Sequence, residues 1–410
     1  MTKIVASFFK NKGGVMSQNL LGKQIGDEID EEQKEKIRDL IDKQKIKGIS
    51  IDTTAFGRNA TDLKAGLISQ LSQFDESHPA KLVISEVIWN EVQAHLCESL
   101  TELRGKTEAG IKAGRKLLGA ENPILQQLSE LLNSKNPEDI AASTIEEFMA
   151  ACHATKLDLD SYTMPSDIFK RYFSKKPPFQ LGKNKSEFPD AAALVSIESW
   201  ADHNDTEVLI VSRDKAWEAF ATESPRLHLV KKLSTALSLF QKHDDFLENF
   251  LNVFKDEIKD QQSSSYFTLE SALWGEDWLS NTKIENLKED AGFIVEEVNF
   301  GDVVQLKLED QNSIEPVRVE KDCVHVEVSF FLSATFDIQI LDSTFPSTSR
   351  KSSQKRIAEI MRNGSCHMSA HIKIPFKRVD SDIEVHIEPF DLTLSIGDIS
   401  AEDWYEDDDD

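Results

Sequence analysis

The chain has 410 residues, of which 40% are hydrophobic and 29% charged, and its formal net charge is -25 at pH 7. This length predicts two or three folding units of ordinary size. No apolar run approaches the roughly 20 residues that cross a bilayer, so a membrane-spanning protein is excluded as the expected class. The acidic balance also excludes a protein that coats nucleic acid with positive charge, and any nucleic-acid contact must be local.

The cysteines and the N-terminus predict a cytoplasmic protein with reduced thiols. The four cysteines lie far apart and form no CxxC pair, so neither a zinc ribbon nor a dense disulfide framework is indicated. The first residues contain only a short apolar stretch, without the long apolar run and the small-residue cleavage site of a secretory signal.

An amphipathic helix precedes the first expected strand. Residues 1–47 end in a charge-rich stretch in which Ile37, Leu40 and Ile41 recur at helical spacing. We therefore expect residues 1–47 to form an N-terminal helical extension.

Four short apolar runs predict a parallel sheet. Each run is aliphatic or β-branched and leads into a helical or loop segment. The runs are residues 48–52, 81–85, 206–212 and 226–230. Strands that alternate with helices are typical of an α/β fold with a parallel sheet. We expect this domain to span residues 48–260, with a leucine-rich helical insertion at about 99–162.

The C-terminal part has a different pattern. The polar run QQSSS at 261–265 breaks the helical pattern, and several later segments alternate polar and apolar residues, as antiparallel strands with one solvated face do. We expect a β-rich accessory domain at 266–400. The remaining residues, 401–410, form an acidic tail that the composition predicts to be disordered.

The candidate site residues are carboxylates at the ends of the expected strands and on the helices. Asp52 ends the first strand, and Asp214 directly follows the strand at 206–212. Asp190 lies at the start of a helix, and Glu91 lies on a partly apolar helix face; Glu86, in the first turn of that helix, is the alternative to Glu91. A solvated strand end or the helix dipole explains each acid alone. Strand ends of an open α/β sheet, however, share one crevice, which can collect them.

Such a cluster predicts a metal site with hydrolytic chemistry. Carboxylates brought together repel each other unless a cation neutralises them, and hard oxygen ligands select Mg²⁺ or Mn²⁺. Metal ions held by carboxylates activate water for phosphodiester hydrolysis. We expect Asp52, Glu91, Asp190 and Asp214 to be both metal ligands and catalytic residues, around one ion or two.

The order of these motifs resembles that of the PIN-domain nucleases, in particular the PIN-like group with a Lys-x-Glu-Phe-Pro-Asp stretch. The matching pieces span residues 48 to about 240 and are ISIDTTAF, LVISEVIWNEV, KSEFPDAAALVSIESWA and VLIVSRDKAW. The resemblance implies a three-layer α/β/α fold and divalent-metal-dependent cleavage of RNA or single-stranded DNA.

The resemblance also assigns individual residues. Asp52 matches the first-strand aspartate, Glu91 the glutamate of the following helix, and Asp190 the aspartate that opens the helix after the variable region. Asp214 matches the acid after the last core strand. Ser212 matches the small hydroxyl residue beside that acid, where we expect it to cap the next helix and to contact substrate. The helical insertion and the β-rich part depart from a minimal PIN domain and leave substrate choice open.

A basic and aromatic segment, residues 167–187, precedes Asp190. Lysine and arginine outnumber acidic residues in it, and aromatic rings are interleaved. Basic groups for phosphates and aromatic faces for unstacked bases are the features of a single-strand groove. The segment predicts phosphate contacts from Arg171 and Lys185 and base stacking by Tyr172. The alternative is a solvated rim of lysines over buried rings.

These features favour an endoribonuclease, of a toxin or defence type, that binds RNA or another single-stranded nucleic acid. A single-strand or structure-specific deoxyribonuclease uses the same chemistry, and the sequence does not separate the two. The third hypothesis is a non-catalytic PIN-like scaffold that acts through its β-rich part. In each case the β-rich part is the expected site for a regulatory protein or for self-association.

Overall fold

The computed structural model describes most of the chain outside the N-terminal 28 residues. The described ranges are 29–56, 63–119, 121–179, 186–242, 244–274, 283–285, 293–309, 313–342, 355–377, 383–387, 393–395 and 404–407. No helix in these ranges is long and apolar enough to cross a membrane.

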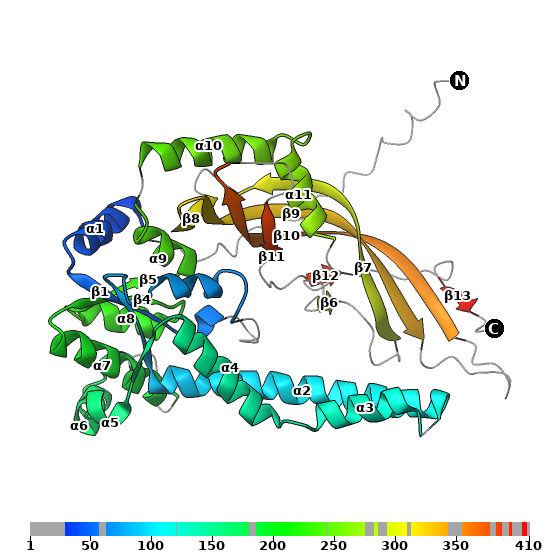
Figure 1. Ribbon diagram of the computed structural model, residues 1–410, viewed down its shortest axis with the longest axis horizontal. Coiled ribbons are helices and arrows are strands. Elements are labelled where there is room, and N and C mark those ends of the chain that lie inside the picture. The colour runs from blue at the N-terminus through cyan, green and yellow to red at the C-terminus, as the bar shows by residue number, and fades with distance from the viewer. Residues whose placement is uncertain are drawn as a thin grey trace.

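A five-stranded sheet with the order β3-β2-β1-β4-β5 forms the centre of the first part of the chain (Figure 1). All of its strand pairs are parallel, which confirms the predicted sheet. Its strands are β1 (Ile46–Ile51), β2 (Lys81–Ser85), β3 (Thr155–Leu157), β4 (Glu207–Val211) and β5 (Leu227–Val230). The central strands are buried on both faces because successive residues in them are aliphatic or small.

Helices flank this sheet and give the expected α/β/α core. They are α1 (Glu31–Asp42), α2 (Glu86–Leu118), α4 (Pro137–Ala151), α5 (Leu159–Tyr162), α6 (Pro165–Phe173), α7 (Phe188–His203), α8 (Lys215–Glu223) and α9 (Leu233–Leu239), with the short 3-10 helices η1 (Thr53–Phe56) and η2 (Ile68–Gln73). Within 1–47, the predicted extension contains α1, whose Ile37 is buried against the sheet.

The predicted helical insertion begins inside a helix. Helix α2 starts at Glu86 and continues for 33 residues, which is about 50 Å at 1.5 Å per residue. Its second half extends away from the parallel sheet and packs on α3 (Pro123–Leu132), as Figure 1 shows. The region 99–162 also contains β3, an edge strand that the sequence analysis did not predict.

A six-stranded antiparallel sheet forms the second part, as the alternating pattern predicts. Its main order is β11-β10-β9-β7, with β8 beside β9 and β13 beside β10. The strands are β7 (Phe293–Leu308), β8 (Ile314–Val319), β9 (Cys323–Asp342), β10 (Lys355–Pro375), β11 (Glu384–Ile387) and β13 (Trp404–Asp407), and a separate pair joins β6 (Lys283–Glu285) to β12 (Thr393–Ser395).

The prediction of a disordered acidic tail is wrong for Trp404–Asp407. These residues form β13, which pairs antiparallel with residues 355–358 of β10. Backbone pairing with a strand end provides hydrogen-bond partners for both segments. Composition alone does not reveal a pairing partner that lies almost fifty residues earlier in the chain.

The two helices that follow the parallel-sheet domain in the sequence belong to the second core. Leu247, Phe254 and Ile258 of α10 (Asp245–Lys259) pack in the cluster that includes β9 and β10. The sequence placed this helix in the nuclease domain, but its apolar face covers the antiparallel sheet. The polar run at 261–265 does not end the helical region either, because α11 (Ser264–Ala272) begins within it, capped by the Ser263 hydroxyl.

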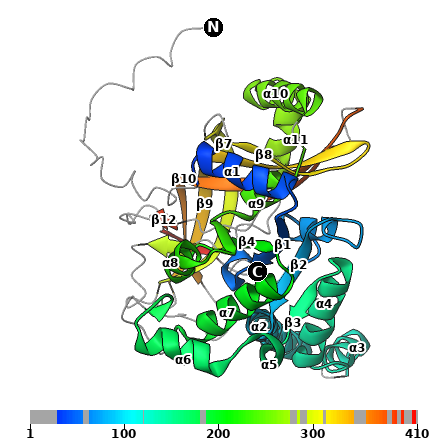
Figure 2. The same cartoon turned by 90° about the vertical axis from the view of Figure 1, so that its left-hand side faces the viewer.

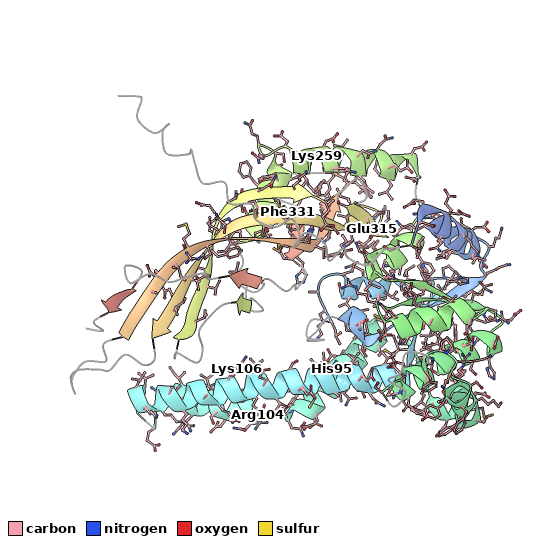
Figure 3. All side chains as sticks on the ribbon, turned by 180° about the vertical axis from the view of Figure 1, so that it is seen from behind. His95, Arg104, Lys106, Lys259, Glu315 and Phe331 are labelled. Carbon is pink, nitrogen blue, oxygen red and sulfur yellow. The ribbon has the colours of Figure 1, made fainter. Side chains whose placement is uncertain are left out.

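Strand β8 joins the two parts. The Glu315 carboxylate accepts hydrogen bonds from Ser234 Oγ (2.6 Å) and Thr235 Oγ1 (3.0 Å) at the start of α9. Val317 is buried in the first core, and its carbonyl accepts from Gln73 Nε2 at 3.0 Å. Figure 3 labels Glu315 at this junction, and Figures 1 and 2 both show the antiparallel sheet and α10 on one side of the parallel-sheet domain.

Candidate active site

Asp52 lies at the carboxyl edge of the parallel sheet, directly after β1. Its backbone N–H donates to the Val211 carbonyl at the end of β4 (2.9 Å), so the strand ladder fixes its position. The side chain is only 4% exposed and accepts hydrogen bonds from Ser212 Oγ (2.8 Å), Thr54 Oγ1 (2.8 Å) and Thr53 Oγ1 (3.2 Å). These hydroxyls hold the carboxylate in one orientation and offset part of its lost hydration.

Ser212 connects Asp52 to the acid of the next loop. Its hydroxyl donates to Asp52 and accepts from the backbone N–H of Asp214 at 3.0 Å. The expectation that Ser212 caps α8 is wrong, because Asp214 is the N-cap and its Oδ1 accepts from Ala216 N at 2.5 Å. Because Ser212 is buried and both of these bonds are internal, its geometry fits positioning of Asp52 rather than the substrate contact expected from the sequence.

Glu91 lies close to Asp52 although the two residues come from different elements. Burial raises the pKa of the half-buried Glu91 carboxyl, and the charge of Asp52 raises it further. His95, one turn along α2 and labelled in Figure 3, lowers that pKa, as does a hydrogen bond from Thr53. The end of β1, which carries Asp52, and the second turn of α2, which carries Glu91, therefore lie close together.

Glu86 faces a different environment. Its Oε2 accepts from Leu159 N at 3.1 Å, and its Oε1 lies 3.7 Å from Lys156 Nζ. The Glu86 side chain thus fastens the β3–α5 connection to the start of α2. We therefore assign Glu91 to the acid cluster, because the charge of Asp52 adds to burial in raising the pKa of Glu91.

Asp190 opens α7, where Pro189 occupies the first turn as the sequence predicts. The indole Nε1 of the fully buried Trp217 donates to Asp190 Oδ1 at 2.8 Å. Burial raises the pKa of Asp190 to about 6; the charges of Asp52 and Asp214 raise it too, while the Trp217 bond lowers it. Asp190 therefore lies within the electrostatic reach of two of the other predicted acids.

The donor set fits a divalent cation. Asp52 raises the pKa of both Glu91 and Asp190, which means that the carboxylates repel one another when all are ionised. A cation between them removes that repulsion, and an all-oxygen set suits a hard ion such as Mg²⁺ or Mn²⁺. Asp214, on the outer side of the cluster, is exposed.

The aromatic residues before Asp190 divide into two groups. Tyr172 packs edge-on against the buried Phe179 and lies tilted over Phe188, which precedes Pro189 and Asp190. Phe169 and Phe173 instead lie on the outer face of α6, 49% and 77% exposed, with their rings stacked at 6.2 Å between centroids. The inner rings support the start of α7, whereas the outer pair presents bare aromatic surface.

The predicted phosphate contact of Arg171 conflicts with its surroundings. Its guanidinium lies 3.3 Å from the Glu198 carboxylate and 4.1 Å from the centroid of the Phe220 ring. The Arg171 guanidinium already has a carboxylate partner within the protein. Its contacts therefore fit a structural role, in which Arg171 holds α6 to α7 and α8. Lys185 lies outside the described residues.

Other exposed basic residues lie beside Asp214 and in the predicted basic segment. Arg213 and Lys215 flank Asp214 and are exposed, and Lys175 and Lys176 are exposed in the turn after α6. The sequence signal for Arg213 is its place beside the strand-end acid in VSRDKAW.

The described geometry is that of an α/β/α domain with acids gathered at the carboxyl edge of a parallel sheet, and the family comparison agrees with it. The family model described as PIN domain matches residues 49–217, so this segment belongs to the PIN-domain family. PIN domains are nuclease-like domains that typically depend on divalent metal ions. Neither the curated proteins nor the solved structures compared with the chain gave a match.

Proposed function

We propose that the chain is a divalent-metal-dependent endoribonuclease, with Asp52, Glu91, Asp190 and Asp214 as its metal ligands and catalytic residues. The observation that carries the proposal is the placement of the acids: Asp52 is held by Ser212 and Thr54 at the sheet edge, and its charge adds to burial in raising the pKa of Glu91 and of Asp190, which come from separate elements. Carboxyls whose pKa is raised by burial and by a neighbouring carboxylate gather at functional sites, which disfavours the non-catalytic scaffold.

Three of the four acids have a distinct task in this proposal. A bound divalent ion would supply charge neutralisation at the phosphate and a lowered pKa for the attacking water. Asp52, fixed by its hydroxyl donors, and Asp190, fixed by the Trp217 indole, supply ligand oxygens in set positions. Glu91, whose pKa is raised, is suited to accept the proton of the water that attacks phosphorus. Water adds to phosphorus as the bond to the leaving oxygen breaks.

A single-stranded substrate is favoured by the exposed rings of α6. Stacking of a base on an aromatic ring requires an unstacked base, which a duplex does not offer. Phe169 and Phe173 lie beside Tyr172 and Phe188, the rings that lead into Asp190. We therefore assign base stacking to Phe173 in place of Tyr172, and phosphate contact to Lys175, Lys176 and Arg213 in place of Arg171.

The second part is proposed to restrain the nuclease and to carry a regulatory partner or a second copy, as a toxin or defence nuclease requires. We place this part at residues 244–407, because α10 and α11 pack in its core. Support comes from β8, whose Glu315 and Val317 are embedded in the nuclease part. A partner bound to the antiparallel sheet therefore has a direct structural connection to α9 and η2.

The substrate class is tested by incubating the purified chain with end-labelled RNA, single-stranded DNA and duplex DNA of the same sequence, with Mn²⁺, Mg²⁺ or EDTA. The proposal predicts internal cleavage of RNA that EDTA abolishes. Cleavage of single-stranded DNA in preference to RNA would assign the deoxyribonuclease function instead. A lack of cleavage of all three substrates with either ion would favour the scaffold.

A further inference from the structure

A second group of metal-binding side chains lies in the β8–β9 hairpin. Cys323 and His325 are two residues apart at the start of β9, so their side chains lie on the same face of the sheet. Glu320 follows β8, and its backbone N–H donates to the Cys323 carbonyl at 2.9 Å across a two-residue turn. The turn thereby brings a carboxylate to the face that carries the thiol and the imidazole.

The three donors lie close enough together to surround one zinc ion. Cys323 Sγ lies 3.4 Å from Glu320 Oε2 and 3.9 Å from His325 Nε2, and His325 Nε2 lies 3.9 Å from Glu320 Oε1. Zn–S bonds of about 2.3 Å and Zn–N or Zn–O bonds of about 2.0–2.1 Å put neighbouring donors of a tetrahedron about 3.3–3.8 Å apart. The Cys323–Glu320 separation falls within this range, the two separations from His325 Nε2 are slightly longer, and one ligand atom from each of the three residues lies within 4.8 Å of the others.

A buried histidine on the next strand sets the orientation of His325. His371 Nε2, on β10, lies 3.3 Å from His325 Nδ1, and the two rings are stacked with an interplanar angle of 18°. When His325 Nδ1–H donates to His371, the lone pair on His325 Nε2 faces Cys323 and Glu320. Metal-binding histidines use this arrangement, in which the second ring nitrogen donates to a fixed acceptor.

The nearby Arg318 guanidinium occupies one oxygen of the Glu320 carboxylate and leaves the other for a metal ion. Arg318 Nε pairs with Glu320 Oε1 at 2.9 Å, while Oε2 is the oxygen nearest to Cys323. Lys373, on the other side, pairs with Glu384 at 2.7 Å. With a thiolate, a carboxylate and a neutral imidazole as ligands, a divalent ion leaves the site without net charge.

We propose that Glu320, Cys323 and His325 bind one Zn²⁺, with His371 as the positioning residue for His325 and a fourth position for water. Thiolate and imidazole donors favour zinc over the hard ions that suit the carboxylate cluster. The two sites share no residue, and this site does not depend on the proposed nuclease function. Because Arg318 also donates to Ser72 Oγ in the nuclease part, at 3.2 Å, the ion fastens the hairpin that joins the two parts.

The experiment uses the full chain with Asp52→Asn. This substitution weakens ion binding at the carboxylate cluster, so that the zinc measured is the zinc held by the hairpin. Zinc per chain is measured by mass spectrometry after dialysis, and Co²⁺ is then added to the metal-free protein. We expect one retained Zn²⁺ and, with Co²⁺, a thiolate-to-cobalt charge-transfer band. The further variants are Cys323→Ser and His325→Gln, with Cys366→Ser and His367→Gln, on β10, as matched controls.

The proposal predicts that the Cys323 and His325 variants lose the retained Zn²⁺ and that the Cys323 variant loses the charge-transfer band, while both controls keep them. His371→Gln should weaken zinc binding about 10- to 100-fold without removing the band, as loss of a positioning partner does. If Cys323→Ser fails to fold, Glu320→Gln is measured and should also weaken zinc binding. A charge-transfer band that survives Cys323→Ser, or a parent that binds no zinc, would overturn the proposal.

Discussion

The indole N–H of Trp217 donates a 2.8 Å hydrogen bond to Oδ1 of Asp190. Trp217 is fully buried on α8, the helix that Asp214 caps, while Asp190 opens α7. This single bond therefore couples the helices that present two acids of the candidate site. It also favours the ionised form of Asp190, against the burial that raises the pKa of this carboxyl to about 6.

Trp217→Phe keeps most of the buried aromatic surface but removes the indole donor. We expect cleavage to fall about tenfold, as it does when an outer partner of a metal ligand is lost. The pKa of Asp190 should rise further, which shifts the acidic limb of the pH–rate profile to higher pH. The control is Trp200→Phe, at another buried tryptophan, on α7. An unchanged acidic limb in Trp217→Phe would show that the hydrogen bond does not tune Asp190.

Metal binding should weaken on acidification through about pH 6, because Asp190 must lose its proton to act as a ligand and its pKa is raised to about 6. Calorimetric titration with Mn²⁺ at about pH 5 and about pH 7.5 measures this, and the affinity should be lower at the more acidic pH. In Asp190→Asn the affinity should be low at both values, with a smaller difference between them. A parent affinity that is equal at the two pH values would contradict the assignment.

The stability of the metal-free protein should also depend on the protonation of Asp190. The pKa of Asp190 is raised in the folded chain above its ordinary value of 3.8, so folding favours the protonated form. This stabilising contribution is complete below about pH 4 and is lost as the pH rises through about 6. Asp190→Asn should therefore raise the free energy of unfolding at about pH 7.5 when EDTA is present.

Urea unfolding at about pH 5 and about pH 7.5 tests this expectation, with the exposed Glu146→Gln as a control. The control should leave the urea midpoint unchanged at both values. Added Mn²⁺ should stabilise the parent and leave Asp190→Asn nearly unaffected. Destabilisation by Asp190→Asn at the higher pH would mean that the ionised carboxylate supports the fold.

The two groups of rings should respond differently to substitution. Phe173→Ala should weaken binding of single-stranded RNA by roughly 1–3 kcal/mol, the usual value of one base stack, and leave the urea midpoint unchanged because this ring is 77% exposed. Tyr172→Ala should lower the midpoint because Tyr172 packs on Phe179 and Phe188. Binding is measured in Ca²⁺, with Phe267→Ala on α11 as an exposed control. Equal RNA affinity in Phe173→Ala and the parent would remove α6 from the substrate surface.

Much of the fold was predictable because the physical signals are local. The strands β1, β2, β4 and β5 are mostly apolar runs, and in a parallel sheet such runs mark buried strands. Strand β3 was missed because Thr155–Leu157 is short and only Leu157 is buried. Its place in the sheet comes from pairing with β2, a tertiary contact without a local pattern.

The site was predictable where position along the strands determines it. Asp52 and Asp214 follow strands that pair in parallel, so the sheet itself brings the segments of these two acids together. The roles of Ser212, Arg171 and Trp217 depend on partners far away in the sequence. No spacing rule reveals that Arg171 pairs with Glu198 or that His325 lies against His371.

Cleavage by Asp52→Asn and Asp190→Asn, compared with the parent in Mn²⁺ and in EDTA, tests the central claim most directly. Both substitutions keep the side-chain shape, remove one ligand charge and relieve repulsion in the metal-free protein, so the fold should persist by circular dichroism. We predict that each variant cleaves labelled RNA at least about tenfold more slowly than the parent in Mn²⁺ and that EDTA abolishes the parent's activity. Parent-level cleavage by both folded variants, or parent cleavage that persists in EDTA, would contradict a metal-dependent site built on these carboxylates.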